Sequence, residues 1–183
     1  MKFKKIKLTK KRKQDYLQVT FSKTDVSTDR QTFDASYVKT SNQPMTRKLS
    51  DAIDTLLPHL MFGSEKIDGT LKLDGDLNYE KWFKNHDFKD DERFENAYVT
   101  GIEFFGKDDY DGVKITGYWE TANSAKPFKN NFSTPVLNLD KMAENKYALS
   151  SLLCDHIDDL ITLIDGWLEK VETTPNNQLS IAV

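Results

Sequence analysis

The feature that most constrains this fold is an amphipathic run near the end of the chain, from Leu149 to Val171. Its apolar residues recur at spacings of three and four positions, which is the period of an α-helix with one buried face. The opposite side carries five carboxylates, at Asp155, Asp158, Asp159, Asp165 and Glu169. An apolar stripe of this length needs a partner surface of comparable size, so we expect the helix to pack against a sheet.

Six segments supply that sheet, because apolar and polar residues alternate along each of them. Each segment offers one apolar face, so the strands fit a sheet that is covered on one side only. A loop at residues 10–14 joins the first two as a hairpin. The predicted strands are Lys2–Thr9, Tyr16–Ser22, Gln31–Val38, Tyr98–Phe105, Val113–Trp119 and Phe128–Leu139.

A second helix is predicted between the two groups of strands, from Thr46 to Met61. Pro58 should kink its last turn, because proline has no backbone N–H to donate. Residues 63–96 are rich in turns and charge, with a short hairpin predicted at 70–77 and a short helix at 79–84. We interpret residues 63–96 as an insertion.

This order of elements predicts an α+β fold of two layers, an antiparallel sheet of about six strands with two helices on one face. A single domain at 1–172 then consists of a first half at 1–62, the insertion and a second half at 97–172, and a flexible tail follows at 173–183. The two predicted helices share Asp, Ile, Asp and Leu in register. Duplication of a β-β-β-α unit explains this similarity, and chance resemblance between acidic amphipathic helices is the alternative.

Composition restricts the class of protein. The 183 residues suffice for one domain with a core, and an aromatic content of 11% is too high for a disordered chain. The single cysteine, Cys154, cannot form an intramolecular disulfide. No segment has the apolar length of a signal peptide or a transmembrane helix. We therefore expect a cytoplasmic protein with no membrane partner, whose oligomeric state the sequence leaves open.

Charge is distributed unevenly along the chain. Residues 1–23 carry nine basic side chains against one acidic one, a net charge of +8, whereas the whole chain carries −3 and the other 160 residues therefore −11. The basic cluster centres on the predicted hairpin, and its residues could lie along single- or double-stranded nucleic acid: Lys10, Lys11, Arg12, Lys13 and the neighbouring Tyr16. The alternative is that lysines on an edge strand prevent aggregation. The acidic remainder should repel a long duplex.

Two further segments could bind a protein partner. The tail residues Gln178, Leu179 and Ile181 resemble the Q-L-[SD]-L-F peptides by which bacterial DNA-processing proteins dock on the sliding clamp, although the final Phe is missing. In the insertion, the predicted short helix would present Tyr79, Trp82 and Phe83 together. With the acidic helix face, these aromatic residues would suit an inhibitor of a host factor, because an acidic surface can stand in for DNA.

No motif indicates catalysis, a cofactor or a metal. The three histidines lie far apart in the sequence, and His156 is interpreted as a histidine at the edge of the core. The run from Asp74 begins like a calcium loop, but Tyr79 replaces the required glycine and Asn85 the bidentate glutamate. We interpret the segment that begins at Asp74 as a solvated turn. The carboxylate stripe of the last helix is interpreted as its solvent-exposed face. An enzyme of unrecognised type stays the third alternative.

The stretch VTGIEFFGKDDYDGVKITG, from Val99 to Gly117, followed by Thr134-Pro135 and the long last helix, resembles small uncharacterised proteins encoded by phages and prophages of Bacteroidetes-type bacteria. The resemblance covers the C-terminal half and implies a cytoplasmic protein of a bacterial host that accompanies replication or recombination. The resemblance assigns no function to any individual residue. The expected function is that of a non-enzymatic accessory protein of DNA metabolism, which binds nucleic acid through the basic hairpin or a replication protein through its tail.

Overall fold

The computed structural model describes residues 2–11, 14–27, 31–41, 43–67, 91–106, 110–121, 128–139, 149–172 and 180–181. In chain order the elements are β1 (Lys2–Lys11), β2 (Gln14–Val26), β3 (Thr32–Thr40), α1 (Arg47–Asp54), α2 (Leu57–Gly63), the 3-10 turn η1 (Glu92–Phe94), β4 (Ala97–Phe105), β5 (Gly112–Glu120), β6 (Lys129–Ser133), β7 (Leu137–Asn138), α4 (Ser150–Glu172) and β8 (Ser180–Ile181).

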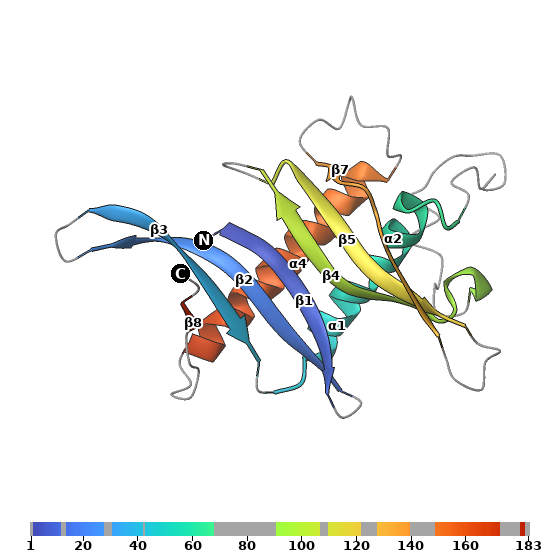
Figure 1. Cartoon of the computed structure of the whole chain (residues 1–183), viewed down its shortest axis with the longest axis horizontal. Helices are drawn as coiled ribbons and strands as arrows, with labels where there is room; N and C mark the ends of the chain where they lie inside the picture. The colour runs from blue at the N-terminus through green and yellow to red at the C-terminus, as the bar shows by residue number, and fades with distance from the viewer. Residues whose placement is uncertain are drawn as a thin grey trace.

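The strands of the described residues form one antiparallel sheet in the order β6-β5-β4-β1-β2-β3-β8, with β7 also paired to β5 (Figure 1). The predicted α+β class is therefore confirmed. The order is symmetric about the β1–β4 pair, since β1-β2-β3 runs outward on one side and β4-β5-β6 on the other. A duplicated β-β-β-α unit would give this order, and the duplication itself stays a prediction.

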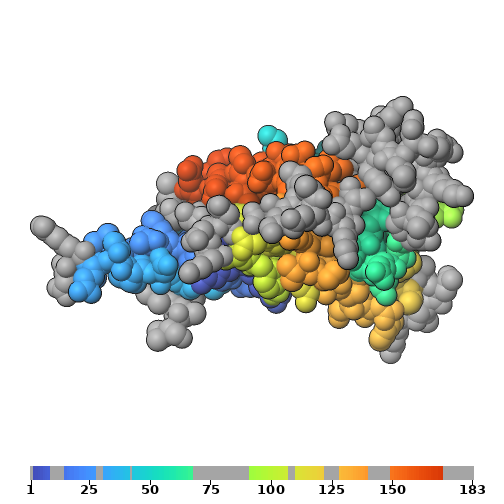
Figure 2. Space-filling view, turned by 90° about the horizontal axis from the view of Figure 1, so that it is seen from above, coloured from blue at the N-terminus to red at the C-terminus, as the bar shows by residue number. Residues whose placement is uncertain are grey.

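The helices form the second layer. Figures 1 and 2 show α4 crossing the sheet on one face, with α1 on the same side. The apolar stripe of α4 is fully buried against this face through Leu153, Ile157, Leu160 and Ile164. Each such side chain contributes about 1.5–3 kcal/mol of burial free energy, which makes this helix the main support of the sheet.

The helix predicted from Thr46 to Met61 is divided into α1 and α2. Thr46 caps α1, because its hydroxyl accepts a hydrogen bond from the N–H of Leu49. The chain turns at residues 55–56, and Pro58 lies in the first turn of α2. This differs from the predicted kink in a last turn: the first turn of a helix needs no donor from proline, so Pro58 starts a helix there.

The strands also differ from the prediction in their extent and in their number. Lys10 and Lys11 belong to β1 and Gln14 to β2, so the loop predicted at 10–14 is shorter. The predicted last strand is divided into β6 and β7 around Pro135. Of the tail for which we predicted no order, residues 180–181 form β8 on the edge of β3.

The hairpin of β2 and β3 extends beyond the helix layer, as Figure 2 shows at the blue end of the molecule. Val26 and Phe33 lie near its far end, and both are at least half exposed. The apolar residues of the hairpin that lie nearer to β1, such as Val19 and Phe21, are buried. The helix layer therefore covers the centre of the sheet, where β1 meets β4.

Candidate functional site

The seam between β1 and β4 is short. Among the described residues, the two strands pair only from Lys5 to Lys7, opposite Gly101 to Glu103. A bulge between Val99 and Gly101 bends β4 at this point. Gly101 permits the close approach, because a Cβ there would lie 2.7 Å from the carbonyl oxygen of Ile6. Beyond the bulge the strands separate toward the hairpin end of β1, where α1 lies behind them (Figure 1).

A cleft of about 410 Å³ opens where the strands separate. Apolar side chains from β1, the segment before α1 and α1 itself line part of it, namely Leu8, Met45 and Ile53. Polar groups on the same wall are Asp15, Ser50 and Asp54. The β4 side and the mouth are lined by Tyr98, Val99, Thr100, Tyr118 and Lys129.

Backbone hydrogen bonds hold α1 beneath this cleft. The N–H of Ser41 donates to the carbonyl of Leu17 at 2.9 Å, and the N–H of Met45 donates to the carbonyl of Asp15 at 3.0 Å. Both bonds tie the connection between β3 and α1 to the same stretch of β2. The polar and apolar groups of the two elements are thereby fixed relative to one another.

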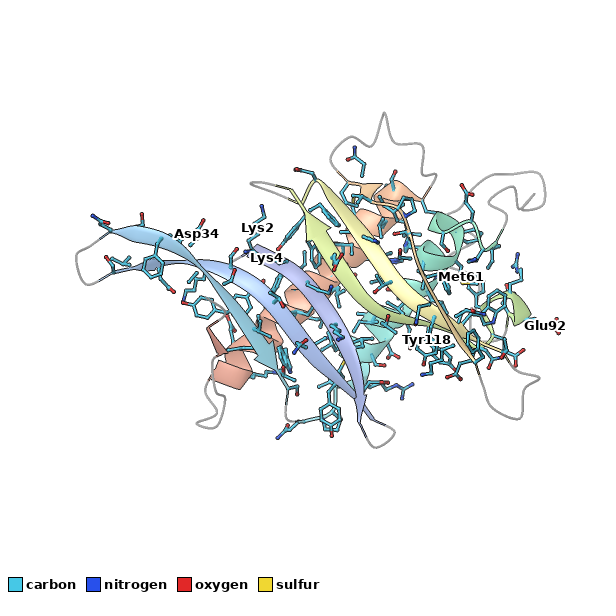
Figure 3. All side chains as sticks on the ribbon, in the orientation of Figure 1. Lys2, Lys4, Asp34, Met61, Glu92 and Tyr118 are labelled. Carbon is cyan, nitrogen blue, oxygen red and sulfur yellow. The ribbon has the colours of Figure 1, made fainter. Side chains whose placement is uncertain are left out.

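Two tyrosines stack on the face of the sheet that points away from the helices. Gly117 faces Leu60 of α2, so its neighbour Tyr118 and the paired Tyr98 face outward. Their ring centroids are 5.0 Å apart and the planes differ by 30°. Figure 3 shows Tyr118 on β5, far along the sheet from Lys2 and Lys4 at the start of β1.

Lys129 completes this group from β6. Its Nζ lies 4.1 Å from the centroid of the Tyr118 ring and 3.4 Å from the carboxylate of Glu120. The hydrogen bond with Tyr118, followed by that with Glu120, raises the pKa of Lys129 above its ordinary value. The cation beside the exposed Tyr98 and the half-buried Tyr118 therefore stays charged at neutral pH.

Lysines predominate over carboxylates on the exposed face. The strand register places six lysines and three carboxylates on this side of the described sheet, which are Lys2, Lys4, Lys5, Lys7, Lys114, Lys129, Asp34, Glu103 and Glu120. Lys5 forms an ion pair with Glu103. The face is thus net positive although the chain as a whole is negative.

Of the residues predicted to bind nucleic acid, the backbone of Lys10, Lys11 and Tyr16 lies at the cleft end of the sheet. Lys10 and Lys11 pair with Asp15 and Gln14 in the strand ladder, and Lys11 continues the register row of Lys5 and Lys7. The side chains of Lys10 and Lys11, and the whole of Arg12 and Lys13, lie outside the description. Tyr16 is half-buried and pairs with Thr9 on the exposed face.

Only one of the residues predicted to bind a protein partner belongs to the part of the chain that the structure describes. Tyr79, Trp82, Phe83, Gln178 and Leu179 lie outside the described residues, as do the suggested calcium run and the elements expected in 68–90. Ile181 lies in β8, where it pairs with Tyr37 of β3. This tail residue therefore contacts the protein's own sheet edge.

The structure brings two histidines together, which the sequence analysis did not predict. His59 of α2 and His156 of α4 approach to 3.1 Å between Nε2 and Nδ1, although 97 positions separate them in the chain. Burial, followed by the charge of His156, lowers the pKa of His59 well below its ordinary value. Burial also lowers the pKa of His156, against the opposing charges of Asp155 and Asp159. Apolar residues surround both histidines in the two predicted helices, and this pattern could have indicated that the two side chains are buried.

A second cavity, of about 570 Å³, lies at the other end of β5 beside η1. Trp119 lines it together with three glutamates, Glu92, Glu95 and Glu120. Asn96, also in its wall, has a backbone φ of 61°. Unlike the cleft, this cavity has no lysine among the described residues that line it.

Within the described part of the chain, no group of three or more His, Cys, Asp or Glu side chains could hold a metal ion. Nor does any helix there have the length and apolar character needed to cross a membrane. Burial and the charges of Asp158 and Asp155 raise the pKa of the Cys154 thiol, which opposes a role as nucleophile. The cleft and the exposed lysine face therefore stand as the candidate site.

Comparison of the chain with protein-family models, with curated proteins and with solved structures finds no match. The site must consequently be interpreted from its own geometry.

Proposed function

We propose that this protein binds single-stranded nucleic acid, without catalysis, on the exposed face of its sheet at the cleft end. The observation that carries the proposal is the stacked pair of Tyr98 and Tyr118 with Lys129 beside it. Exposed aromatic rings on a positively charged surface are the recurring means of binding single strands, since every base offers a π-face.

The arrangement of charge supports the same proposal. Lys5 and Lys7 follow one another along β1 toward its hairpin end, on the same face of the sheet as the two tyrosines. Lysines in such a row can follow a phosphate backbone and release its counterions. The exposed side of α4, in the helix layer, carries carboxylates instead, at Asp155, Asp158, Asp159 and Glu169.

A single strand fits this surface better than a duplex. The bases of a single strand are free to stack on exposed rings, whereas those of a duplex are stacked on one another. The acidic remainder of the chain would also repel a long duplex that extends past the positive face. A strand-binding protein of this kind suits the accessory role in phage DNA metabolism that the resemblance implies.

Fluorescence anisotropy with a labelled oligothymidylate of about 15 nucleotides tests the proposal. Binding should weaken between about 20 and about 200 mM salt, with a slope of about −0.7 for each phosphate contact. The variant in which Lys10, Lys11, Arg12 and Lys13 become Ala should have a shallower slope. Loss of a stacking ring in Tyr118→Ala should cost about 1–3 kcal/mol of binding free energy.

Lys48→Ala is the matched control, because Lys48 is an exposed lysine of α1 in the helix layer. It should bind the oligonucleotide like the wild type. Absence of binding even at low salt would refute the proposal. Binding that neither Tyr118→Ala nor the hairpin variant weakens would refute the assigned surface.

A further inference from the structure

We propose that the cleft between β1 and β4 is a base-specific pocket that selects guanine. The inference rests on the proposed function and deepens it, because the cleft opens beside the tyrosines that we assign to strand binding. In this cleft, hydrogen-bonding groups, apolar side chains and stacked rings line the same cavity.

The cleft has the size and lining of a site for a small planar molecule. Its volume of about 410 Å³ falls within the range of about 300–1,000 Å³ that is usual for such sites. Leu8, Met45 and Ile53 give it an apolar wall. Tyr98 and Tyr118 offer rings on which a base can stack as it enters.

The polar groups of the cleft select for hydrogen-bond donors. The carboxylates of Asp15 and Asp54 line the cleft, and a charged carboxylate only accepts hydrogen bonds. The hydroxyls of Ser50 and Thr100 can donate or accept, and therefore do not reverse this preference. The lining thus favours a base that has adjacent donors on one edge.

Guanine alone among the common bases has two adjacent donor groups on its Watson–Crick edge, the N1–H and the N2 amino group. Adenine and cytosine each present one amino group beside an acceptor, and uracil and thymine present a single N–H. A carboxylate can accept both guanine donors at once, and a bidentate pair of this kind discriminates against other bases. Lys129 at the mouth can then hold the phosphate of the same nucleotide.

Two features of the backbone fix the shape of the cleft. The bulge before Gly101 separates the strands, and only glycine allows the close contact with Ile6 from which they diverge. The Met45–Asp15 hydrogen bond fixes the acidic end of β2 against the start of α1. The acceptors from β2 and α1 therefore face one cavity without a rearrangement of the backbone.

The test uses the four nucleoside monophosphates GMP, AMP, CMP and UMP with the full-length protein. Titrations are followed through the backbone amide resonances of Val99 and Thr100, which line the cleft. GMP should bind about tenfold or more tighter than the other three, the discrimination expected of one bidentate pair. Inosine monophosphate, which lacks the N2 amino group, should lose most of that advantage.

The double variant Asp15→Asn/Asp54→Asn should abolish the preference for GMP while its melting temperature stays close to that of the wild type, because both side chains are exposed at the cleft. Asp158→Asn, an exposed carboxylate of α4, is the matched control and should keep the preference. Equal binding of all four nucleotides, no binding of any, or a preference that survives in the double variant would overturn the inference.

The two proposals can fail separately. Binding of oligothymidylate without any preference for GMP would retain the strand-binding function and reject the guanine pocket. Binding of GMP in the cleft without binding of oligothymidylate would support the pocket and reject the strand-binding surface.

Discussion

His59 Nε2 and His156 Nδ1 face one another at 3.1 Å across the contact between α2 and α4. One of the two nitrogens must carry a proton and the other must accept it, so the pair is satisfied when both rings are neutral. If both of these nitrogens carried a proton, two hydrogen-bond donors would face one another. Because His59 is fully buried, water cannot relieve that repulsion.

The first prediction concerns stability in mild acid. The pKa of each histidine is lower in the folded protein than in the unfolded chain, where it has its ordinary value of about 6.5. The unfolded chain therefore binds more protons below that pH, and the free energy of unfolding should fall as pH decreases from about 6.5 toward 5. For the buried His59, each pKa unit of lowering is worth about 1.4 kcal/mol. Urea unfolding at a series of pH values measures this loss.

The variant His59→Gln separates the histidine pair from other acid effects. Glutamine can keep a hydrogen bond to His156 but does not titrate. Its stability should therefore depend less steeply on pH than that of the wild type between about 6.5 and 5. Parallel curves for the two proteins would show that the pair does not control acid stability.

A second prediction uses two glycines with opposite surroundings. A Cβ on Gly117 would lie 2.3 Å from Leu60 Cδ2 and 2.3 Å from the carbonyl oxygen of Tyr98, so Gly117→Ala should destabilise the protein by about 1–3 kcal/mol or more. A Cβ on Gly166 in α4 would meet nothing within 4 Å. Gly166→Ala should instead stabilise by about 0.5–1 kcal/mol, because alanine favours the helix. If thermal unfolding showed that both substitutions change stability in the same direction, this account would be wrong.

A third prediction concerns Cys154. Its Sγ lies 3.8 Å from the carbonyl of Leu139 and is partly buried, and burial with two nearby aspartates raises the pKa of the thiol. Because the thiolate is the reactive form, alkylation of the native protein near pH 7.5 should be slower than that of the protein unfolded in urea by about tenfold or more. Equal rates would show that the thiol is accessible and unperturbed.

The sequence predicted the six main strands and the long helix because their patterns depend on local alternation. Leu17, Val19 and Phe21 follow the two-residue period of a strand with one buried face, and all three are buried. The strands extend further than predicted at their ends, since Lys10, Lys11 and Gln14 pair across β1 and β2 without any apolar pattern. Pairing between neighbouring strands can thus continue where the hydrophobic pattern stops.

The cleft could not be derived in the same way, because it depends on the register between β1 and β4. Those strands are about 90 residues apart in the chain, and no local pattern fixes which residues meet. Gly101 inside a strand was the available clue to a bulge or a close approach. Tyr98 and Tyr118 likewise occupy polar-face positions of their strands, but their stacking requires the observed pairing.

The last prediction concerns the edge of β3. Ser180 and Ile181 pair with Val38 and Tyr37, a two-residue strand on one that is nine residues long. A chain that ends at residue 179 should show faster amide hydrogen exchange at Tyr37 and Val38, and should lose no more than about 1.5 kcal/mol of stability for each hydrogen bond. The uncovered edge should also increase self-association with protein concentration. Removal of residues 182–183 alone is the control, because it leaves the β8 pairing in place. Unchanged exchange in the shorter chain would mean that β8 does not protect this edge in solution.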